Sequence, residues 1–248
     1  MSANLLSVHE RRHFLDQGYL KLLQVYDGKE VEELRSFVDV EATKERRRQQ
    51  IIGNRTLKVY GLYDRNPELM GRIIKSRRLI KALVGILGPN VVFVKNRHNH
   101  ATVNDQIGEP AEGLHRDVLQ PTRGLITAVL YLEDANVSNG ATRVIPGSHN
   151  LPYVGVPQAN GGGTWMHEHE EYAGMEDQAL PVPVAEGGVL IFNALLFHGA
   201  GQNFTGSPRR SITMGFRSVD ELDIDPDVSR LVLTSGAYIY RGNDTQPR

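Results

Sequence analysis

The stretch Gly113-Leu114-His115-Arg116-Asp117 carries a histidine and an aspartate two residues apart. On an extended strand, residues at this spacing project to the same face, so the imidazole and the carboxylate would lie side by side. A third ligand would have to come from elsewhere in the chain, and His198 is the candidate. Two histidines and one carboxylate on one face of an octahedral Fe(II) ion leave three positions open, the arrangement of non-haem iron oxygenases. The sequence therefore predicts a metal site formed by His115, Asp117 and His198.

An H-x-D pair alone is weak evidence in a chain with nine histidines, because such a pair can arise by chance. Two further motifs support the predicted metal site. One runs from His198 through Asn203 to Arg209, eleven residues beyond the histidine. The other lies between the two metal segments and reads Asn139-Gly140-Ala141-Thr142-Arg143-Val144-Ile145-Pro146-Gly147-Ser148-His149. In these motifs the sequence resembles the phytanoyl-CoA dioxygenase-like branch of the Fe(II)/2-oxoglutarate oxygenases. The resemblance extends from about His9 to Arg217.

The resemblance implies Fe(II), 2-oxoglutarate and O2 as cofactors. It also implies that Arg209 binds the far carboxylate of 2-oxoglutarate, which a guanidinium can hold with two parallel hydrogen bonds. Arg210 is the rival, because neighbouring residues on a strand point to opposite faces and only one of the two can face the site. The family's spacing favours Arg209, and Ser211 and Thr213 would then share its face.

Two weaker candidates for binding 2-oxoglutarate lie on other predicted strands. Thr127 is on the strand after the H-x-D segment, and Asn99 comes just after an earlier strand, where Arg97 is a rival. Asn203, together with the preceding glutamine, is a candidate for orienting the second ring nitrogen of His198, with a role in the turn as an equal alternative.

The chemistry that the resemblance implies is oxidation of an unactivated C–H bond, with 2-oxoglutarate converted to succinate and CO2. Hydroxylation is the expected outcome, and desaturation, cyclisation and epimerisation remain alternatives. The presence of Asp117 argues against halogenation, for which related enzymes carry a small residue at this position. No acid, base or nucleophile beyond the iron ligands is required.

Two functions of other classes also remain open: a cupin-type metal isomerase or hydrolase, and a non-catalytic small-molecule binding protein. The isomerase would have no use for an arginine that binds a dicarboxylate. The expected substrate is a small polar molecule or secondary metabolite, as in natural product biosynthesis. Arg97, Arg116 and Arg123 would favour an anionic substrate if they lay near the pocket, although solvated surface arginines are the commoner case.

Helices precede strands in this sequence, which predicts an α+β protein. A helical part, about residues 1–89, is expected to buttress a double-stranded β-helix of about 90–218, the jelly-roll or cupin-like fold, followed by a C-terminal tail at 219–248. The length of 248 residues and the hydrophobic content of 40% fit one oxygenase domain. Strands are expected at 91–95, 113–117, 125–132, 142–145, 188–192 and 211–217.

Local signals place the helices. Residues 9–17 form the first, followed by a short strand. A capping box of Asp27 and Glu30 begins a helix that runs into the mid-forties. Two more amphipathic helices are expected within 67–87, the second capped by Ser76.

Composition excludes several function classes. A net charge of −1 and a pI near 6.8 give no electrostatic basis for binding nucleic acid or an anionic membrane. The basic run at 44–48 has glutamates interleaved with it and predicts a solvated helix surface. The chain contains no cysteine, so neither disulfides nor thiolate ligation are available. Without a signal peptide or a long apolar run, the protein is expected to be cytoplasmic, and its oligomeric state is left open.

Residues 153–180 interrupt the regular spacing of strands with a glycine run and a histidine-glutamate cluster, His167-Glu168-His169-Glu170-Glu171. A second metal site is the less favoured interpretation of this cluster, because an exposed polar loop explains it. An insertion of this length beside an active site is typical of a lid or a substrate-selecting loop.

Overall fold

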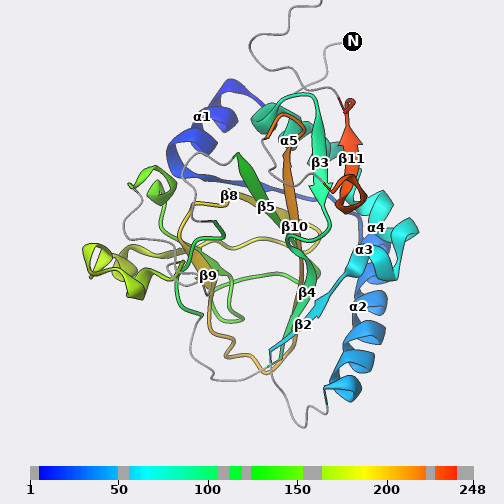
Figure 1. The fold of residues 1–248 in the computed structure, drawn as a ribbon. Coiled ribbons are helices and arrows are strands. Elements are labelled where there is room, and N and C mark those ends of the chain that lie inside the picture. Colours follow the sequence, from blue (N-terminus) through cyan, green and yellow to red (C-terminus); the bar gives the residue numbers. More distant parts are fainter. Residues whose placement is uncertain are drawn as a thin grey trace, which may run out of the picture.

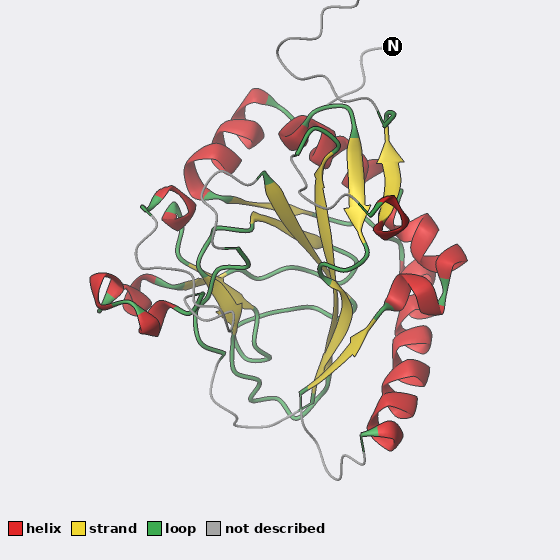
Figure 2. Cartoon of the chain, viewed as in Figure 1, coloured by secondary structure: helices red, strands yellow, loops and turns green. Residues whose placement is uncertain are grey.

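The computed structural model describes residues 6–49, 56–105, 112–118, 124–152, 164–221 and 227–238. Within them, two antiparallel sheets form the centre of the molecule and helices lie along its periphery (Figure 1). Figure 2 shows the longest helix running along one side of the strands, and short helical turns projecting on the opposite side.

The larger sheet has eight strands. Its main order is β1 (Tyr19–Leu22), β8 (Val189–Asn193), β5 (Leu125–Tyr131), β10 (Arg209–Ser218), β3 (Val91–Val94) and β11 (Leu231–Ser235). The first part of β10 also pairs with β4 (Asn99–Asn104), which in turn pairs with β2 (Leu57–Tyr60). Strand β10 therefore pairs with three strands, β5, β4 and β3, and its first residue, Arg209, lies opposite Asn104.

The smaller sheet has the order β7 (Leu180–Pro181), β6 (Thr142–Val144) and β9 (His198–Ala200). Its inner side chains pack against the larger sheet, where Val144 joins a cluster with Tyr131 of β5 and Phe192 of β8. Every residue of β5 is buried, because helices cover the other face of this sheet. That explains why β5 reads as a nearly continuous apolar run, interrupted by Thr127, with no regular polar alternation.

The helices are α1 (Val8–Gln17), α2 (Gly28–Arg48), α3 (Leu62–Arg65), α4 (Pro67–Ile74) and α5 (Arg77–Leu87). Short 3-10 turns follow at Ser148–Asn150, Met166–Glu168, Glu170–Tyr172, Met175–Gln178 and Val228–Arg230. Leu34 of α2 and Leu79 of α5 are fully buried in one cluster with Phe93 of β3 and Phe216 of β10. Burying each such side chain contributes about 1.5–3 kcal/mol, so this cluster anchors the helices to the sheet.

The expected helix starts are present with one difference. At α2, the Asp27 carboxylate accepts the Glu30 N–H at 3.0 Å, and the Glu30 carboxylate accepts the Asp27 N–H at 3.0 Å, which completes the capping box. Ser76 is the N-cap residue of α5, but its side chain forms no capping hydrogen bond.

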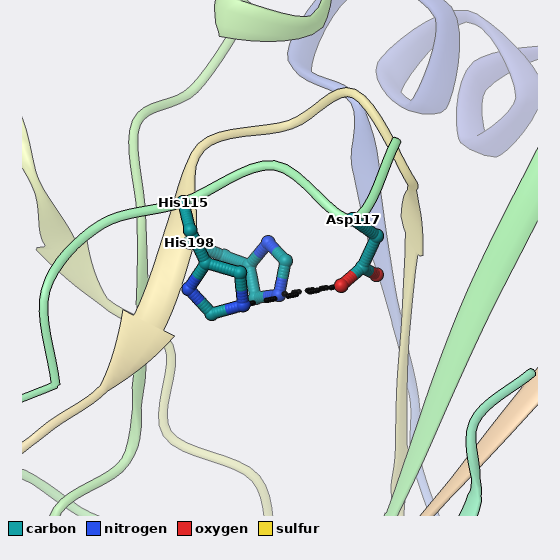
Figure 3. A group of neighbouring side chains, drawn as sticks. All are labelled: His115, Asp117 and His198. Carbon is teal, nitrogen blue, oxygen red and sulfur yellow. Dashed lines mark ion pairs between the residues drawn. The ribbon is translucent and has the colours of Figure 1, made fainter. Parts of the chain in front are cut away.

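The strand expected at 113–117 is reduced to isolated bridges, in which His115 lies opposite Trp165 on one side and His198 on the other. A continued ladder would pair Asp117 with Leu196. Instead the Asp117 N–H bonds to the carbonyl of Ala194, because the chain turns between Asn193 and Leu196. The two metal-binding candidates of this segment nevertheless face the same way, as the spacing predicts (Figure 3).

Part of the expected C-terminal tail belongs to the sheet. Strand β11 pairs with β3, with Leu231 opposite Val94 and Val232 opposite Phe93. In the part of the chain that the structure describes, no helix has the length and apolar character needed to cross a membrane.

Candidate metal and cofactor site

His115 and His198 form one hydrogen-bonded pair of antiparallel backbone. The His115 N–H bonds to the His198 carbonyl at 2.9 Å, and the His198 N–H bonds to the His115 carbonyl at 3.0 Å. Residues that face each other in this way project their side chains to the same side. The imidazole centroids accordingly lie 4.5 Å apart, and both rings point toward Asp117 (Figure 3). Backbone pairing thus fixes the relative position of the two rings.

Each ring also has one nitrogen engaged by the backbone. His115 Nδ1 lies 3.3 Å from the carbonyl oxygen of Gly113, and His198 Nδ1 lies 2.9 Å from that of Leu196. Because a carbonyl only accepts, Nδ1 donates and Nε2 keeps its lone pair, as a metal ligand requires. Burial, followed by the neighbouring His198, lowers the pKa of His115 and favours its neutral, metal-binding form.

Asp117 completes the group. Its Oδ1 lies 3.6 Å from His198 Nε2 and 3.9 Å from His115 Nε2, and one ligand atom of each residue lies within 4.8 Å of the others. Burial would raise the pKa of Asp117, but His198 and His98 hold it well below its ordinary value. An ionised carboxylate and two imidazole nitrogens converge on one point, which is the donor set that suits Fe(II).

These residues lie in a cavity of about 330 Å³. One wall is the inner face of the larger sheet, on which every second residue of β4 and of the first half of β10 faces the cavity. The paired positions across these strands are Asn104 with Arg209, Thr102 with Ser211, and His100 with Thr213.

Arg209 faces this cavity from a buried position, with 3% of its surface exposed. Its Nε has no hydrogen-bond partner, and among the described residues no acceptor contacts its guanidinium. Its nearest aromatic neighbour is Tyr131, whose ring centroid lies 6.0 Å from the guanidinium carbon. Burial lowers the pKa of Arg209 from its ordinary value. The charges of Glu133 and Glu112 offset part of the cost of this burial, and an anion that entered the cavity could supply the hydrogen-bond acceptor that the guanidinium lacks.

Arg210 points to the opposite face of β10. Its Nε lies 2.6 Å from Asp39 Oδ1 and its Nη1 lies 2.7 Å from Glu133 Oε1. The two adjacent arginines are therefore separated as the strand geometry requires, with Arg209 as the one that faces the cavity.

The two weaker candidates for the cofactor lie apart from Arg209. Thr127 lines the cavity, but its hydroxyl donates to Asp117 Oδ2 at 2.6 Å. Asn99 lies on the other face of β4, where its Oδ1 accepts the Tyr63 N–H at 2.9 Å. It lines a neighbouring depression, which shares Lys58, His98 and His100 with the cavity.

Of the arginines considered for substrate binding, Arg97 and Arg116 do not line the cavity. Arg116 is buried beneath the site, where its Nη2 donates to the Ser148 carbonyl at 2.9 Å and its guanidinium carbon lies 4.3 Å from the ring centroid of Phe197. Arg97 lies near enough to Asp117 for its charge to contribute to lowering that pKa. Arg123 lies outside the described residues.

Asn203 serves the turn between β9 and β10. Its amide donates to the carbonyls of Asn104 and Ser207, at 3.1 and 2.8 Å, and its Oδ1 accepts from Thr205. The contact to the second nitrogen of His198 is made by the Leu196 carbonyl instead. The turn alternative is therefore the one that the structure bears out.

The histidine-glutamate cluster does not form a metal site among the described residues, where the group of His115, Asp117 and His198 is the one with suitable geometry. His167 and Glu168 are exposed. The same segment nevertheless touches the site, because the Trp165 ring lies 4.7 Å from that of His115. Residues 153–163 of the insertion are outside the described part of the chain.

Sequence reasoning missed two histidines. His98 places its Nε2 3.0 Å from Asp117 Oδ2, and His100 lines the cavity on β4. Burial, followed by the charge of His98, lowers the pKa of His100 to about 3. The sequence Arg97-His98-Asn99-His100 did contain a signal for them. The two histidines are two residues apart, which is the spacing of residues on one face of a strand.

Comparison with known proteins finds relatives of this chain by sequence. The family model described as "Phytanoyl-CoA dioxygenase (PhyH)" matches residues 14–211. An iron/alpha-ketoglutarate-dependent dioxygenase of Aspergillus calidoustus is 34% identical over 119 residues, which are 43% of this chain and 34% of the relative. This chain therefore spans about a third of the length of that relative.

Solved structures agree in fold. EctD from S. alaskensis with bound Fe has a TM-score of 0.69 at 19% identity, covering 91% of this chain and 82% of its own. The non-heme alpha ketoglutarate dependent carbocyclase SnoK from nogalamycin biosynthesis has a TM-score of 0.67 at 18% identity, covering 96% and 95%. The expected α+β jelly-roll architecture is confirmed.

Proposed function

This chain belongs to the phytanoyl-CoA dioxygenase family, and on that premise we propose that it is a non-haem Fe(II)- and 2-oxoglutarate-dependent dioxygenase acting on a small polar molecule. The observation that carries the proposal is the convergence of His115, Asp117 and His198 in the same cavity as a buried arginine without an acceptor. We further propose that residues 1–248 form a single oxygenase domain, since β1 and β11, near the two ends of the described chain, belong to one sheet.

In this proposal, Nε2 of His115 and of His198 and Oδ1 of Asp117 bind the metal. Both imidazoles already have the required tautomer, because their Nδ1 atoms donate to backbone carbonyls. The carboxylate is already ionised and needs no proton removed on binding. The site is therefore organised before the metal arrives.

Arg209 binds the far carboxylate of 2-oxoglutarate, and Ser211 and Thr213 line the same cavity. Thr127 and Asn99 have less support as cofactor contacts, because Thr127 donates to Asp117 and Asn99 faces away from the cavity. When bound, Fe(II), 2-oxoglutarate and O2 supply the oxidation of a C–H bond together with release of succinate and CO2.

The lining of the cavity supports a polar substrate over a long acyl chain. Lys58 and Glu112 lie at the cavity with their charged atoms 3.8 Å apart, and His100 adds a further polar ring. Among the described lining residues only a few side chains are wholly apolar, such as Val129 and Phe192, although carbon atoms of the polar side chains add to the apolar surface. Hydroxylation is the expected outcome, and desaturation, cyclisation and epimerisation are alternatives within the same iron chemistry.

The cytoplasmic location of the protein stays a prediction from the sequence.

The isomerase alternative leaves Arg209 without a role, and so does a binding protein for a neutral ligand. A cavity that needs only a metal, or only a neutral ligand, has no reason to bury a guanidinium without an acceptor, since desolvation of that charge is costly. In the dioxygenase proposal, the far carboxylate of 2-oxoglutarate is the anion that pairs with Arg209.

The test is an anaerobic titration with Fe(II) and then 2-oxoglutarate, followed by the weak visible charge-transfer band of the chelate. The wild-type protein should give the band, and His198→Ala should abolish it. Arg209→Ala should raise the 2-oxoglutarate concentration needed by about 10-fold or more, because a charge-assisted pair contributes about 1.5–3 kcal/mol. Arg210→Ala is the matched control and should leave that concentration unchanged.

A wild-type protein that binds iron without developing the band at saturating 2-oxoglutarate would overturn the proposal. It would favour the oxygen-independent metal enzyme. Succinate release in the presence of candidate substrates then identifies the compound class, and product analysis distinguishes hydroxylation from the alternative outcomes.

A further inference from the structure

The two oxygens of the Asp117 carboxylate have different surroundings. Oδ1 faces the two histidines of the candidate metal site, at 3.6 and 3.9 Å. Oδ2 faces away from them and accepts two contacts, from Thr127 Oγ1 at 2.6 Å and from His98 Nε2 at 3.0 Å. The side chain as a whole is 3% exposed, so water has little access to either oxygen.

His98 reaches Asp117 from a strained backbone. It lies in the turn between β3 and β4 with φ of 50°, in the left-handed region that favours glycine. Among the described residues, Gln24 is the one other non-glycine residue with positive φ. A strained residue is retained where the surroundings compensate it, and such residues concentrate at functional sites. The contact that this conformation provides for His98 is the one to Asp117 Oδ2.

His98 is not placed to be a ligand itself. Its nitrogen lies against Oδ2, the carboxylate oxygen turned away from His115 and His198. The group of mutually close ligand atoms among the described residues consists of His115, Asp117 and His198 without it. A neutral imidazole with its proton on Nε2 is sufficient to donate to the carboxylate.

We propose that His98 is a positioning residue that, together with Thr127, holds Oδ2 of Asp117 so that the carboxylate offers Oδ1 alone to the metal. This inference rests on the proposed function, because it presumes the metal site. A carboxylate that bound through both oxygens would occupy a fourth position on an octahedral ion. With Oδ2 held, three positions stay open, as a bidentate cofactor and O2 together require.

The test uses Fe(II) alone, under anaerobic conditions and without 2-oxoglutarate. Trp165 is the only tryptophan of the chain, and its ring lies 4.7 Å from that of the proposed ligand His115. Quenching of its fluorescence therefore reports metal binding without any need for turnover. Thermal unfolding of the metal-free protein is recorded in parallel.

His98→Gly is the informative variant, since it removes the imidazole and also relieves the strained backbone. We expect the affinity for Fe(II) to fall by about 10- to 100-fold, the usual effect of losing a partner of a metal ligand. The metal-free protein should melt at the same temperature as the wild type or above it. A merely structural role for His98 would predict the reverse, a lower melting temperature with unchanged affinity.

Two further variants make the result specific. His98→Gln keeps an amide donor of similar reach and should recover most of the lost affinity. Gln24→Gly relieves the same kind of backbone strain at an exposed position away from the cavity, so it should leave the affinity unchanged.

An affinity within twofold of the wild type in His98→Gly would overturn the inference while leaving the proposed function intact. Failure of His98→Gln to bind more tightly than His98→Gly would also overturn it. If the wild-type protein does not bind Fe(II), the proposed function fails, and this inference fails with it.

Discussion

At the scale of single residues, Arg209 and Arg210 show how neighbours in sequence acquire unrelated roles. Strand geometry turns Arg209 into the cavity and Arg210 toward the helical side, where it pairs with Asp39 of α2 and with Glu133. The family spacing favoured Arg209, and this is the arginine of the two that faces the cavity. The H-x-D pair and His198 were also predictable, because their spacing and motifs are local in sequence.

Arg210→Ala should destabilise the fold without affecting the cavity. It removes two charge-assisted contacts to partly buried carboxylates, so we expect the free energy of unfolding to fall by about 2 kcal/mol. Urea denaturation of the metal-free protein measures this. Glu133 keeps a second partner, Arg35 at 3.3 Å, which should prevent a larger loss. An unchanged free energy of unfolding would show that these ion pairs only offset their own desolvation.

The roles of His98, Arg116 and Asn99 were beyond sequence reasoning, for a physical reason. Each depends on which way a side chain leaves a turn or a bridge, and a shift by one residue reverses that direction. The positive φ of His98 could not be read from a sequence in which glycine is absent from that turn.

At the scale of elements, the C-terminal end of α2 differs from the solvated surface that its charge pattern predicts. Lys44 and Arg48 are exposed, but Glu41 and Glu45 are buried between them and Arg65 of α3. Hydrogen bonds from Arg48 and Gln49 lower the pKa of Glu45 to about 2. The cationic run therefore ties α2 to α3 through two buried carboxylates.

This arrangement predicts a specific pH dependence. The pKa of Glu45 is lower in the folded state than the ordinary value of about 4.3, so its stabilisation is complete above that value and is lost as the pH falls toward about 2. At pH 7, Glu45→Gln should lower the free energy of unfolding by about 1 kcal/mol, a modest figure because solvent screens the exposed Arg48.

The difference between wild type and Glu45→Gln should narrow below pH 4 in urea unfolding. Glu33→Gln, at an exposed position of the same helix, is the control and should have little effect at either pH. A difference that stays constant from pH 7 to pH 3 would contradict the assignment to this carboxylate.

Most elements were predictable, and those that were missed are short or polar. Strand β4 reads Asn-His-Ala-Thr-Val-Asn, and β9 has only three residues, two of them glycine and alanine. Their strand conformation comes from pairing with distant neighbours, which no local pattern contains. Strand β2, Leu-Lys-Val-Tyr, does alternate, and its burial follows that alternation.

At the scale of the whole molecule, the C-terminal segment protects the edge of the larger sheet. Strand β11 ends the main strand order and covers β3, whose four residues Val91–Val94 are all buried. The division of the sequence into barrel and tail did not predict this pairing, because β3 begins the expected barrel whereas β11 lies in the expected tail.

A chain ending at residue 226 should therefore expose an apolar edge strand. We expect lower thermal stability and concentration-dependent association, since an uncovered hydrophobic edge pairs with other chains. Light scattering and thermal unfolding measure both effects. A truncated chain that stays monomeric with an unchanged melting temperature would show that β11 is dispensable.

The backbone pair that joins His115 to His198 also decides when a metal can take part in folding. The two residues come from distant parts of the chain, and the entropy of closing the intervening loop opposes their early meeting. Until the loop closes, His115 and Asp117 are not close to His198, so the three proposed ligands are not assembled. On the proposed assignment of the ligands, iron binds after the chain has folded, and it should slow unfolding without accelerating folding.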